Sequence, residues 1–135
     1  MSKSLVFIVE DNPIHQKMLQ VHFEQMLGDY IVRTFSDPFE MYPHLNEKPF
    51  AIVLDHFFGN STLTGLDCLK ELKKVSPSTP IIYYTTLSDL KVQTEVMTLG
   101  VHQFIIKDSA SLARLKTALD LLHVKKKGFF QRLFN

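Results

Sequence analysis

Five side chains that could do chemistry stand at the ends of short apolar runs. In chain order they are Glu10, Asp11, Asp55, Thr85 and Lys107. Each run has the length and the β-branched content of a buried strand. In an open parallel sheet the carboxyl ends of the strands open onto the ligand crevice. An acid at one strand end is usually structural, so the prediction of a site depends on these strand ends meeting.

The chemistry that this set favours is the binding of a divalent cation. Three carboxylates at one edge of a sheet repel one another, and a cation relieves that repulsion. Hard oxygen ligands with room for several water molecules suit Mg²⁺. Lys107 would pair with the acids, or with a new anion once one arrives. We therefore predict a Mg²⁺ site that can also receive an anion.

The elements that must position these residues alternate between strand and helix. Strands are predicted at residues 5–9, 30–35, 50–55, 81–85 and 104–106, the more polar second one at an edge. A first helix, capped by Asp11 or Asn12, should run from residue 13 to a stop at Gly28. Three more helices are predicted at residues 38–45, at residues 65–74, and from Ser88 or Asp89 to about residue 99. A fifth and last helix should be capped by Ser109 or Ser111. This alternation predicts an α/β doubly wound domain with a parallel sheet.

Apolar residues at helical spacing predict which helix faces are buried. Leu19, Phe23 and Met26 are expected to face the sheet from the first helix. The leucines of the third and last helices should do the same; these are Leu66, Leu69, Leu72, Leu112, Leu115, Leu119 and Leu122. Cys68 shares a face with two of them and is expected to be a small buried residue.

Composition and charge narrow the remaining possibilities. With 135 residues, 45% of them hydrophobic, the chain has the size of one domain, which we place at residues 1–124. The remaining residues, 125–135, form a basic and aromatic tail without an acid, so the body itself is mildly acidic. This distribution is not that of a nucleic-acid-binding domain. One cysteine and no apolar run long enough for a signal peptide or a membrane span lead us to expect a cytoplasmic protein.

The sequence resembles the receiver domain of bacterial response regulators over about residues 4–123. The resemblance is carried by Val9-Glu-Asp-Asn12, by Asp55, by Thr85 and by Phe104-Ile-Ile-Lys107, in order and each at a strand end. It implies a flavodoxin-like (βα)5 fold with a five-stranded parallel sheet of order 2-1-3-4-5. It also implies a signalling protein that is not an enzyme apart from its own phosphorylation and dephosphorylation.

The resemblance assigns roles to the residues at the site. Asp55 would be the phosphoacceptor, taking a phosphoryl group from the phosphohistidine of a histidine kinase, from a phosphotransfer protein, or from a small phosphodonor. Asp11, Asp55 and the backbone carbonyl of Phe57 would hold Mg²⁺, with Glu10 acting mostly through water. Lys107 would neutralise charge on the phosphoryl oxygens.

Two further residues would carry the response to phosphorylation. Thr85 would donate its hydroxyl to the acyl phosphate and move toward it. Phe104 stands where the family often has a switch aromatic, so a downstream protein is expected to bind the face that bears it.

The sequence departs from the family pattern near the acceptor. The stretch from Asp55 to Gly65 is longer than usual, and Lys107 is followed by Asp108 instead of the frequent proline. The residues two past the acceptor and two past the threonine are apolar, Phe57 and Leu87. Because neither can orient a water molecule, we predict an acyl phosphate that hydrolyses slowly.

Other interpretations remain open at this point. The chain could be a receiver-like interaction module that is never phosphorylated, although the complete residue set speaks against it. A phosphatase or nucleotide-binding protein of the same architecture is disfavoured by Phe57, which stands where such phosphatases have a second aspartate, and by the repulsive pair Glu10 and Asp11. No room is seen for an effector domain after the last helix. The tail is interpreted as a solvated extension, or as a segment that docks to a partner or to an acidic membrane.

Overall fold

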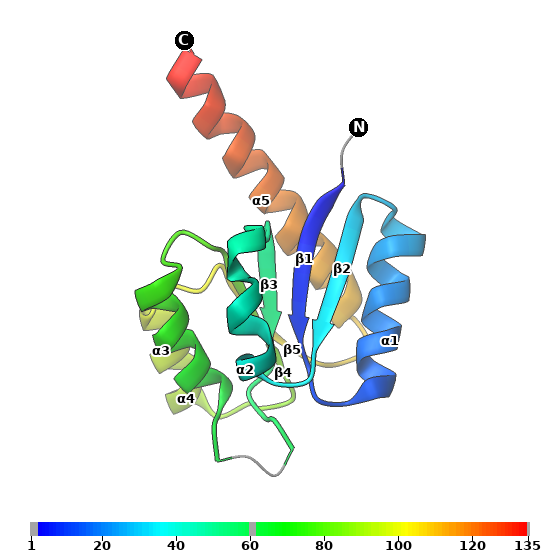
Figure 1. Cartoon of the computed structure of the whole chain (residues 1–135), viewed down its shortest axis with the longest axis vertical. Helices are drawn as coiled ribbons and strands as arrows, with labels where there is room; N and C mark the ends of the chain where they lie inside the picture. The colour runs from blue at the N-terminus through cyan, green and yellow to red at the C-terminus, as the bar shows by residue number, and fades with distance from the viewer. Residues whose placement is uncertain (1–2, 60–61, 135) are drawn as a thin grey trace.

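One five-stranded parallel sheet forms the centre of the molecule, with helices on both faces (Figure 1). The structure, a computed structural model, describes residues 3–59 and 62–134, without the side chains of residues 130 and 134. The strands are β1 (Ser4–Val9), β2 (Tyr30–Phe35), β3 (Ala51–Leu54), β4 (Ile81–Thr85) and β5 (Gln103–Ile106). Their order is β2-β1-β3-β4-β5, which confirms the predicted topology and the edge position of the second strand.

The helices divide between the two faces of the sheet. α1 (Pro13–Val21) and α5 (Ser111–Phe134) cover one face, and α2 (Pro38–Met41), α3 (Gly65–Val75) and α4 (Leu90–Thr98) cover the other. Alternate residues of β1 supply the two cores: Val6 and Ile8 pack with α1 and α5, whereas Phe7 and Val9 pack with α2, α3 and α4. This division is the physical consequence of a period of two along a strand.

Local sequence signals set the helix starts. Asn12 caps α1 by accepting bonds from the backbone N–H groups of residues 14 and 15, and Pro13 occupies the first turn. Thr64 and Asp67 form a reciprocal capping box at the start of α3. Asp89 caps α4, as one of the two predicted residues. Asp108 accepts a bond from the N–H of Ala110 at the start of α5, and Ser111 is already inside that helix.

The leucine faces of α3 and α5 are placed as predicted. Leu69, Leu72, Leu115 and Leu119 are fully buried, Leu122 is nearly so, and Cys68 is buried beside them. Burial raises the pKa of the Cys68 thiol to about 11, so this cysteine is a packing residue.

The prediction that Met26 faces the sheet is wrong. A π-helical segment, η1 (His22–Leu27), continues α1, and the N–H of Gly28 bonds to the carbonyl of Phe23. The wider turn shifts the helical phase by one residue. Phe23 stays buried, Leu27 packs against the core in place of Met26, and Met26 is 75% exposed.

Two other segments differ in length from the sequence-based expectation. The predicted helix at residues 38–45 is the short α2 followed by the 3-10 helix η2 (Tyr42–Glu47), in which Pro43 occupies the first turn. α5 runs on as a helix to Phe134, beyond the last core leucine, and its end projects from the domain (Figure 1).

Candidate phosphoacceptor site

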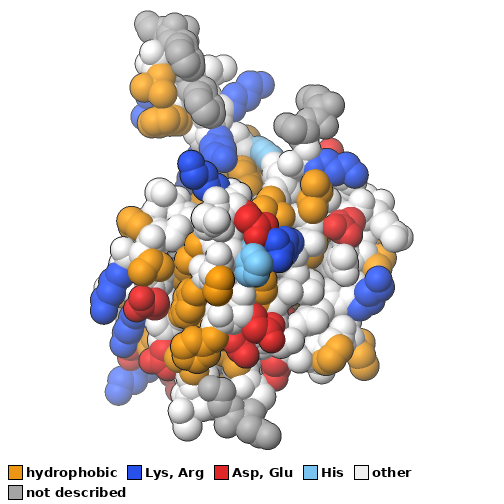
Figure 2. Space-filling view, viewed as in Figure 1, with side chains coloured by type: hydrophobic (Ala, Val, Ile, Leu, Met, Phe, Trp, Pro, Cys, Tyr) orange, Lys and Arg blue, Asp and Glu red, His pale blue; other side chains and the backbone are white. Residues whose placement is uncertain are grey.

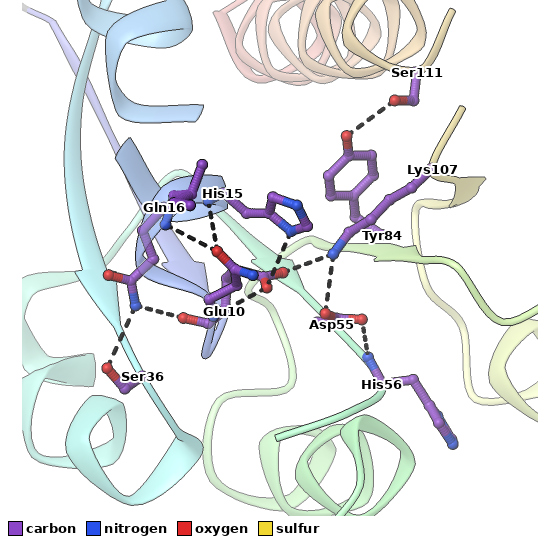
Figure 3. A network of polar contacts seen from close by, with 11 residues as sticks. Glu10, His15, Gln16, Ser36, Asp55, His56, Tyr84, Lys107 and Ser111 are labelled. Carbon is purple, nitrogen blue, oxygen red and sulfur yellow. Dashed lines mark hydrogen bonds and ion pairs between the residues drawn. The ribbon is translucent and has the colours of Figure 1, made fainter. Parts of the chain in front are cut away.

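The strand ends bring the predicted residues to one edge of the sheet, where Figure 3 shows Glu10, Asp55 and Lys107 together. Val9 and Leu54 are register partners, so Glu10 and Asp55, the next residues along, leave β1 and β3 side by side. Lys107 follows β5 directly and donates its backbone N–H to the carbonyl of Thr85, 2.8 Å away. Parallel pairing through β1, β3, β4 and β5 thus delivers residues that are distant in sequence to one place.

Three carboxylates form the acidic part of the site. Each of Glu10, Asp11 and Asp55 offers an oxygen, and these oxygens lie within 4.8 Å of one another. Glu10 and Asp55 are buried, and Asp11 is half-buried at the opening. An all-oxygen donor set that is partly open to water has the chemistry of a site for a hard cation such as Mg²⁺.

Lys107 lies between two of these acids. Its Nζ is 2.7 Å from Oε2 of Glu10 and 3.0 Å from Oδ2 of Asp55. Burial alone would lower the pKa of Lys107, but the bonds and charges of Glu10 and Asp55 outweigh it and raise that pKa. Burial and the neighbouring Asp55 raise the pKa of Glu10 above its usual value, against the opposing pull of Lys107. The lysine is therefore a fixed positive charge at the acceptor.

Glu10 is held by contacts that the sequence did not indicate individually. Its Oε1 accepts the N–H of Asn12 at 3.2 Å and lies 3.6 Å from Nδ1 of His15. The side-chain amide of Gln16 donates to the backbone carbonyl of Glu10 and also contacts Ser36 (Figure 3). His15 and Gln16 reach Glu10 because they lie at the start of α1, which begins three residues after Glu10. In the sequence, only the predicted helix start at Pro13 pointed to these contacts with Glu10.

The loop after Asp55 is fixed by close contacts on both sides. The backbones of Phe57 and Thr64 form an antiparallel bridge, and the N–H of Gly65 bonds to the carbonyl of His56 at 2.8 Å. A Cβ at Gly65 would lie 2.1 Å from the carbonyl oxygen of Asp55, so only glycine fits there. The extra length that the sequence indicated is taken up between Phe57 and Thr64, and residues 60 and 61 of it lie outside the described residues.

The predicted switch residues occupy two neighbouring strands. Thr85 is fully buried, and its Oγ1 accepts the N–H of Leu87 at 3.2 Å. Phe104 is half-buried on β5, and its ring stacks on that of Tyr83 with centroids 5.4 Å apart. The Tyr83 hydroxyl in turn meets Nδ1 of His56. A continuous chain of contacts therefore joins the residue after the acceptor to the aromatic ring on β5.

The side chains of His56 and Asp108 make their contacts with residues other than Asp55. The N–H of His56 donates to Oδ1 of Asp55 at 2.7 Å (Figure 3), while Nδ1 of its ring meets the hydroxyl of Tyr83. Asp108 pairs with Arg114 at 2.7 Å and so does not compete for Lys107. Phe57 is 50% exposed and Leu87 is half-buried.

Comparison with known proteins agrees with this geometry. The model of the family described as response regulator receiver domain matches residues 6–120. No sequence in a search of curated proteins matches the chain.

Solved structures share the fold at low sequence identity. The signal receiver domain of a putative LuxO repressor protein from Vibrio parahaemolyticus is 19% identical, with 98% of each chain covered and a TM-score of 0.77. A LuxR-family two-component response regulator from Aurantimonas sp. SI85-9A1 is 20% identical, covering 90% of this chain and 86% of that one at a TM-score of 0.78. The phosphorylated cyanobacterial phytochrome response regulator RcpA is also 20% identical, with coverages of 90% and 89% and a TM-score of 0.71. Because the family model spans most of the sequence and the fold agrees, this chain belongs to the response regulator receiver domain family.

Proposed function

We propose that this receiver domain is a phosphoacceptor of a two-component or phosphorelay system and is phosphorylated on Asp55. The observation that carries the proposal is the position of Lys107, whose Nζ lies 3.0 Å from Oδ2 of Asp55 within a cluster of three carboxylates. A buried acid with an ammonium group at hydrogen-bond distance can act as a nucleophile toward an anionic group. The ammonium can then neutralise the charge that the reaction delivers.

The transfer uses side chains of this chain in defined roles. An oxygen of Asp55 attacks the phosphorus of a phosphohistidine or a small phosphodonor. The bond between the phosphorus and the donor atom breaks, and its electron pair stays on the donor atom. Lys107 binds a phosphoryl oxygen and leaves its contact with Glu10 or Asp55 to do so. Thr85 rotates its hydroxyl from the N–H of Leu87 to donate to the acyl phosphate.

A Mg²⁺ ion fits the donor set at this edge. Asp11, Asp55 and the backbone carbonyl of Phe57 would hold it, with Glu10 contributing through water. When bound, the ion supplies neutralising charge for the carboxylates and the incoming phosphoryl oxygens. Within the described residues, Lys107 is the one lysine that pairs with these three acids. A single positive charge cannot balance three carboxylates, which supports this assignment.

Apolar neighbours make the acyl phosphate long-lived. Phe57 and Leu87 stand two residues past Asp55 and Thr85, and neither side chain can hydrogen-bond an attacking water molecule. The output is protein contact through the face that bears Phe104, with a histidine kinase or phosphotransfer protein on the input side, in the cytoplasm. No direct contact with nucleic acid is part of the proposal.

Phosphorylation of the intact chain tests the proposal. Incubation with acetyl phosphate and Mg²⁺ should add one phosphoryl group, detected as a mass increase that is absent with a chelator. Asp55→Asn should abolish the addition. Asp108→Asn is the matched control, because Asp108 pairs with Arg114 and lies outside the cluster.

A phosphoryl mimic separates this function from that of an unphosphorylated interaction module. Beryllofluoride with Mg²⁺ should bind the wild type and shift NMR signals of Thr85 and Phe104. Absence of both beryllofluoride binding and phosphorylation would leave only the interaction module.

A further inference from the structure

The end of α5 projects beyond the domain at the pole opposite the phosphoacceptor site (Figure 1). Beyond Leu122, the last core leucine, the helix continues to Phe134. Val124, Phe129 and Leu133 on this extension are 67%, 58% and 60% exposed. An ordered helix with apolar side chains in water has surface that a binding partner could cover.

Every charge on the extension is positive. After Asp120 the sequence has four basic residues and no acidic one; these are Lys125, Lys126, Lys127 and Arg132. Figure 2 shows hydrophobic and basic side chains, but no acidic ones, on the described part of the projection in that view. The partner must therefore carry negative charge.

A groove of about 830 Å³ at the base of the extension is also lined by basic residues. It lies between α5 and the loops that precede β3 and β4. Lys48, Lys125 and Lys126 line it together with serine and threonine hydroxyls, and none of its described lining residues is acidic. This is a second place at the same pole where an anionic group would be met by ammonium and hydroxyl donors.

The base of the extension is fixed to the body of the domain. The ring of His123 stacks on Phe50 with centroids 4.3 Å apart, and Nζ of Lys126 lies 4.8 Å from the centroid of the Phe50 ring. Nε2 of His123 also meets the hydroxyl of Tyr30 at 3.1 Å. The extension and the groove therefore form one surface with a fixed relation to the sheet.

We propose that this pole docks on an anionic lipid bilayer, with the extension lying at the interface and the groove facing the headgroups. The spacing of the charges favours a bilayer over a protein groove. Three consecutive lysines on an α-helix point about 100° apart, so one narrow acidic groove cannot meet them all. At a bilayer interface, apolar side chains enter the acyl boundary while lysine stems extend to the phosphates around them. No helix among the described residues is long and apolar enough to cross a membrane, so the contact is peripheral.

This docking leaves the phosphoacceptor accessible. All five strands run parallel, and the groove is formed by segments that precede strands, whereas Asp55 follows one. A domain held at this pole therefore turns Asp55 away from the bilayer, toward a phosphodonor.

Vesicle co-sedimentation of the full-length chain tests the proposal. Binding is expected to vesicles of phosphatidylcholine with phosphatidylglycerol and not to phosphatidylcholine alone, and it should weaken steeply with added salt. Each cation near an anionic surface strengthens binding roughly fivefold, so K125Q/K126Q/K127Q should weaken it about a hundredfold. The matched control is K17Q/K70Q/K91Q, which removes three exposed lysines elsewhere and should bind like the wild type.

A second pair of measurements excludes other occupants. Phe129→Ser with Leu133→Ser should weaken vesicle binding while leaving the circular dichroism spectrum and phosphorylation by acetyl phosphate unchanged. Equal binding to neutral and anionic vesicles, or equal weakening by both lysine triples, would overturn the proposal. A lipid-free dimer that K125Q/K126Q/K127Q abolishes would also overturn the proposal. Stabilisation of the chain against thermal unfolding by inorganic phosphate, without any vesicle binding, would overturn it as well.

Discussion

Gly65→Ala should damage both stability and phosphorylation, because the new methyl group meets the backbone of Asp55, the proposed phosphoacceptor. The added Cβ would lie 2.1 Å from the carbonyl oxygen of Asp55, 2.9 Å from its carbonyl carbon and 2.7 Å from the hydroxyl oxygen of Tyr83. A carbon and an oxygen that are not bonded approach to about 3.3 Å. The distance from the added Cβ to the Asp55 carbonyl oxygen is therefore about 1 Å too short. Because that oxygen belongs to the backbone, a side-chain rotation cannot relieve the clash.

The size of the effect follows from the rigidity of the neighbours. Overpacking costs about 1–3 kcal/mol, and the upper end applies here because β3 is buried and the N–H of Gly65 is already bonded to the carbonyl of His56. For a domain of this size, a loss of about 3 kcal/mol lowers the melting temperature by roughly 10 °C. A displacement of about 1 Å at a reacting group can lower the rate about a hundredfold.

Two assays on one pair of variants test this reasoning. Urea unfolding followed by circular dichroism gives the stability change, and the rate of phosphorylation by acetyl phosphate with Mg²⁺ gives the change at Asp55. Gly128→Ala is the matched control, because a Cβ there meets no atom within 4 Å. It lies in a helix, so alanine should stabilise by up to about 1 kcal/mol. Gly65→Ala with wild-type stability and rate would refute the account of this contact.

Three further substitutions test the site and the core. Lys107→Met should lower the unfolding free energy by about 3 kcal/mol in chelator, because Glu10 and Asp55 lose their counter-charge; Mg²⁺ should restore part of it, and an identical loss with and without the ion would contradict this. Phe57→Asn should speed phosphate release from the phosphorylated protein about tenfold, since the amide can orient water; an unchanged rate in a radiolabel chase would contradict the shielding role. Burial lowers the pKa of His22, whose ring nitrogens make no hydrogen bond with the described residues. The unpartnered neutral ring costs stability at every pH, and below about pH 6.5 the unfolded chain also takes up a proton more readily than the folded one; His22→Leu should therefore gain about 1 kcal/mol near pH 8 and more near pH 5. A gain independent of pH in urea titrations would contradict this.

Much of the fold was readable because local signals agreed with one another. The apolar runs, the glycine stop at Gly28 and the caps at Asn12 and Asp89 each act within a few residues, so periodicity and capping rules locate them. Met26 was misplaced because those rules assume a regular helix. The π-helical turn that moves Met26 outward does not follow from the local spacing of apolar residues. The bond from the N–H of Gly28 to the carbonyl of Phe23 closes this wider turn.

The sequence by itself determined the kind of chemistry at the site. Acids and a lysine at strand ends lie along one edge of a parallel sheet, because all its strands run the same way. The family resemblance rests on those same positions, and the family match over residues 6–120 agrees with it.

Only the tertiary structure decided how those groups are held. Lys107 reaches both Glu10 and Asp55, and His15 and Gln16 return to Glu10, because separate elements pack at specific distances. The requirement for glycine at position 65 is likewise a contact with Asp55, ten residues earlier in the chain. Spacing along a strand or helix fixes which way a side chain faces, but contacts between elements depend on how the whole domain packs.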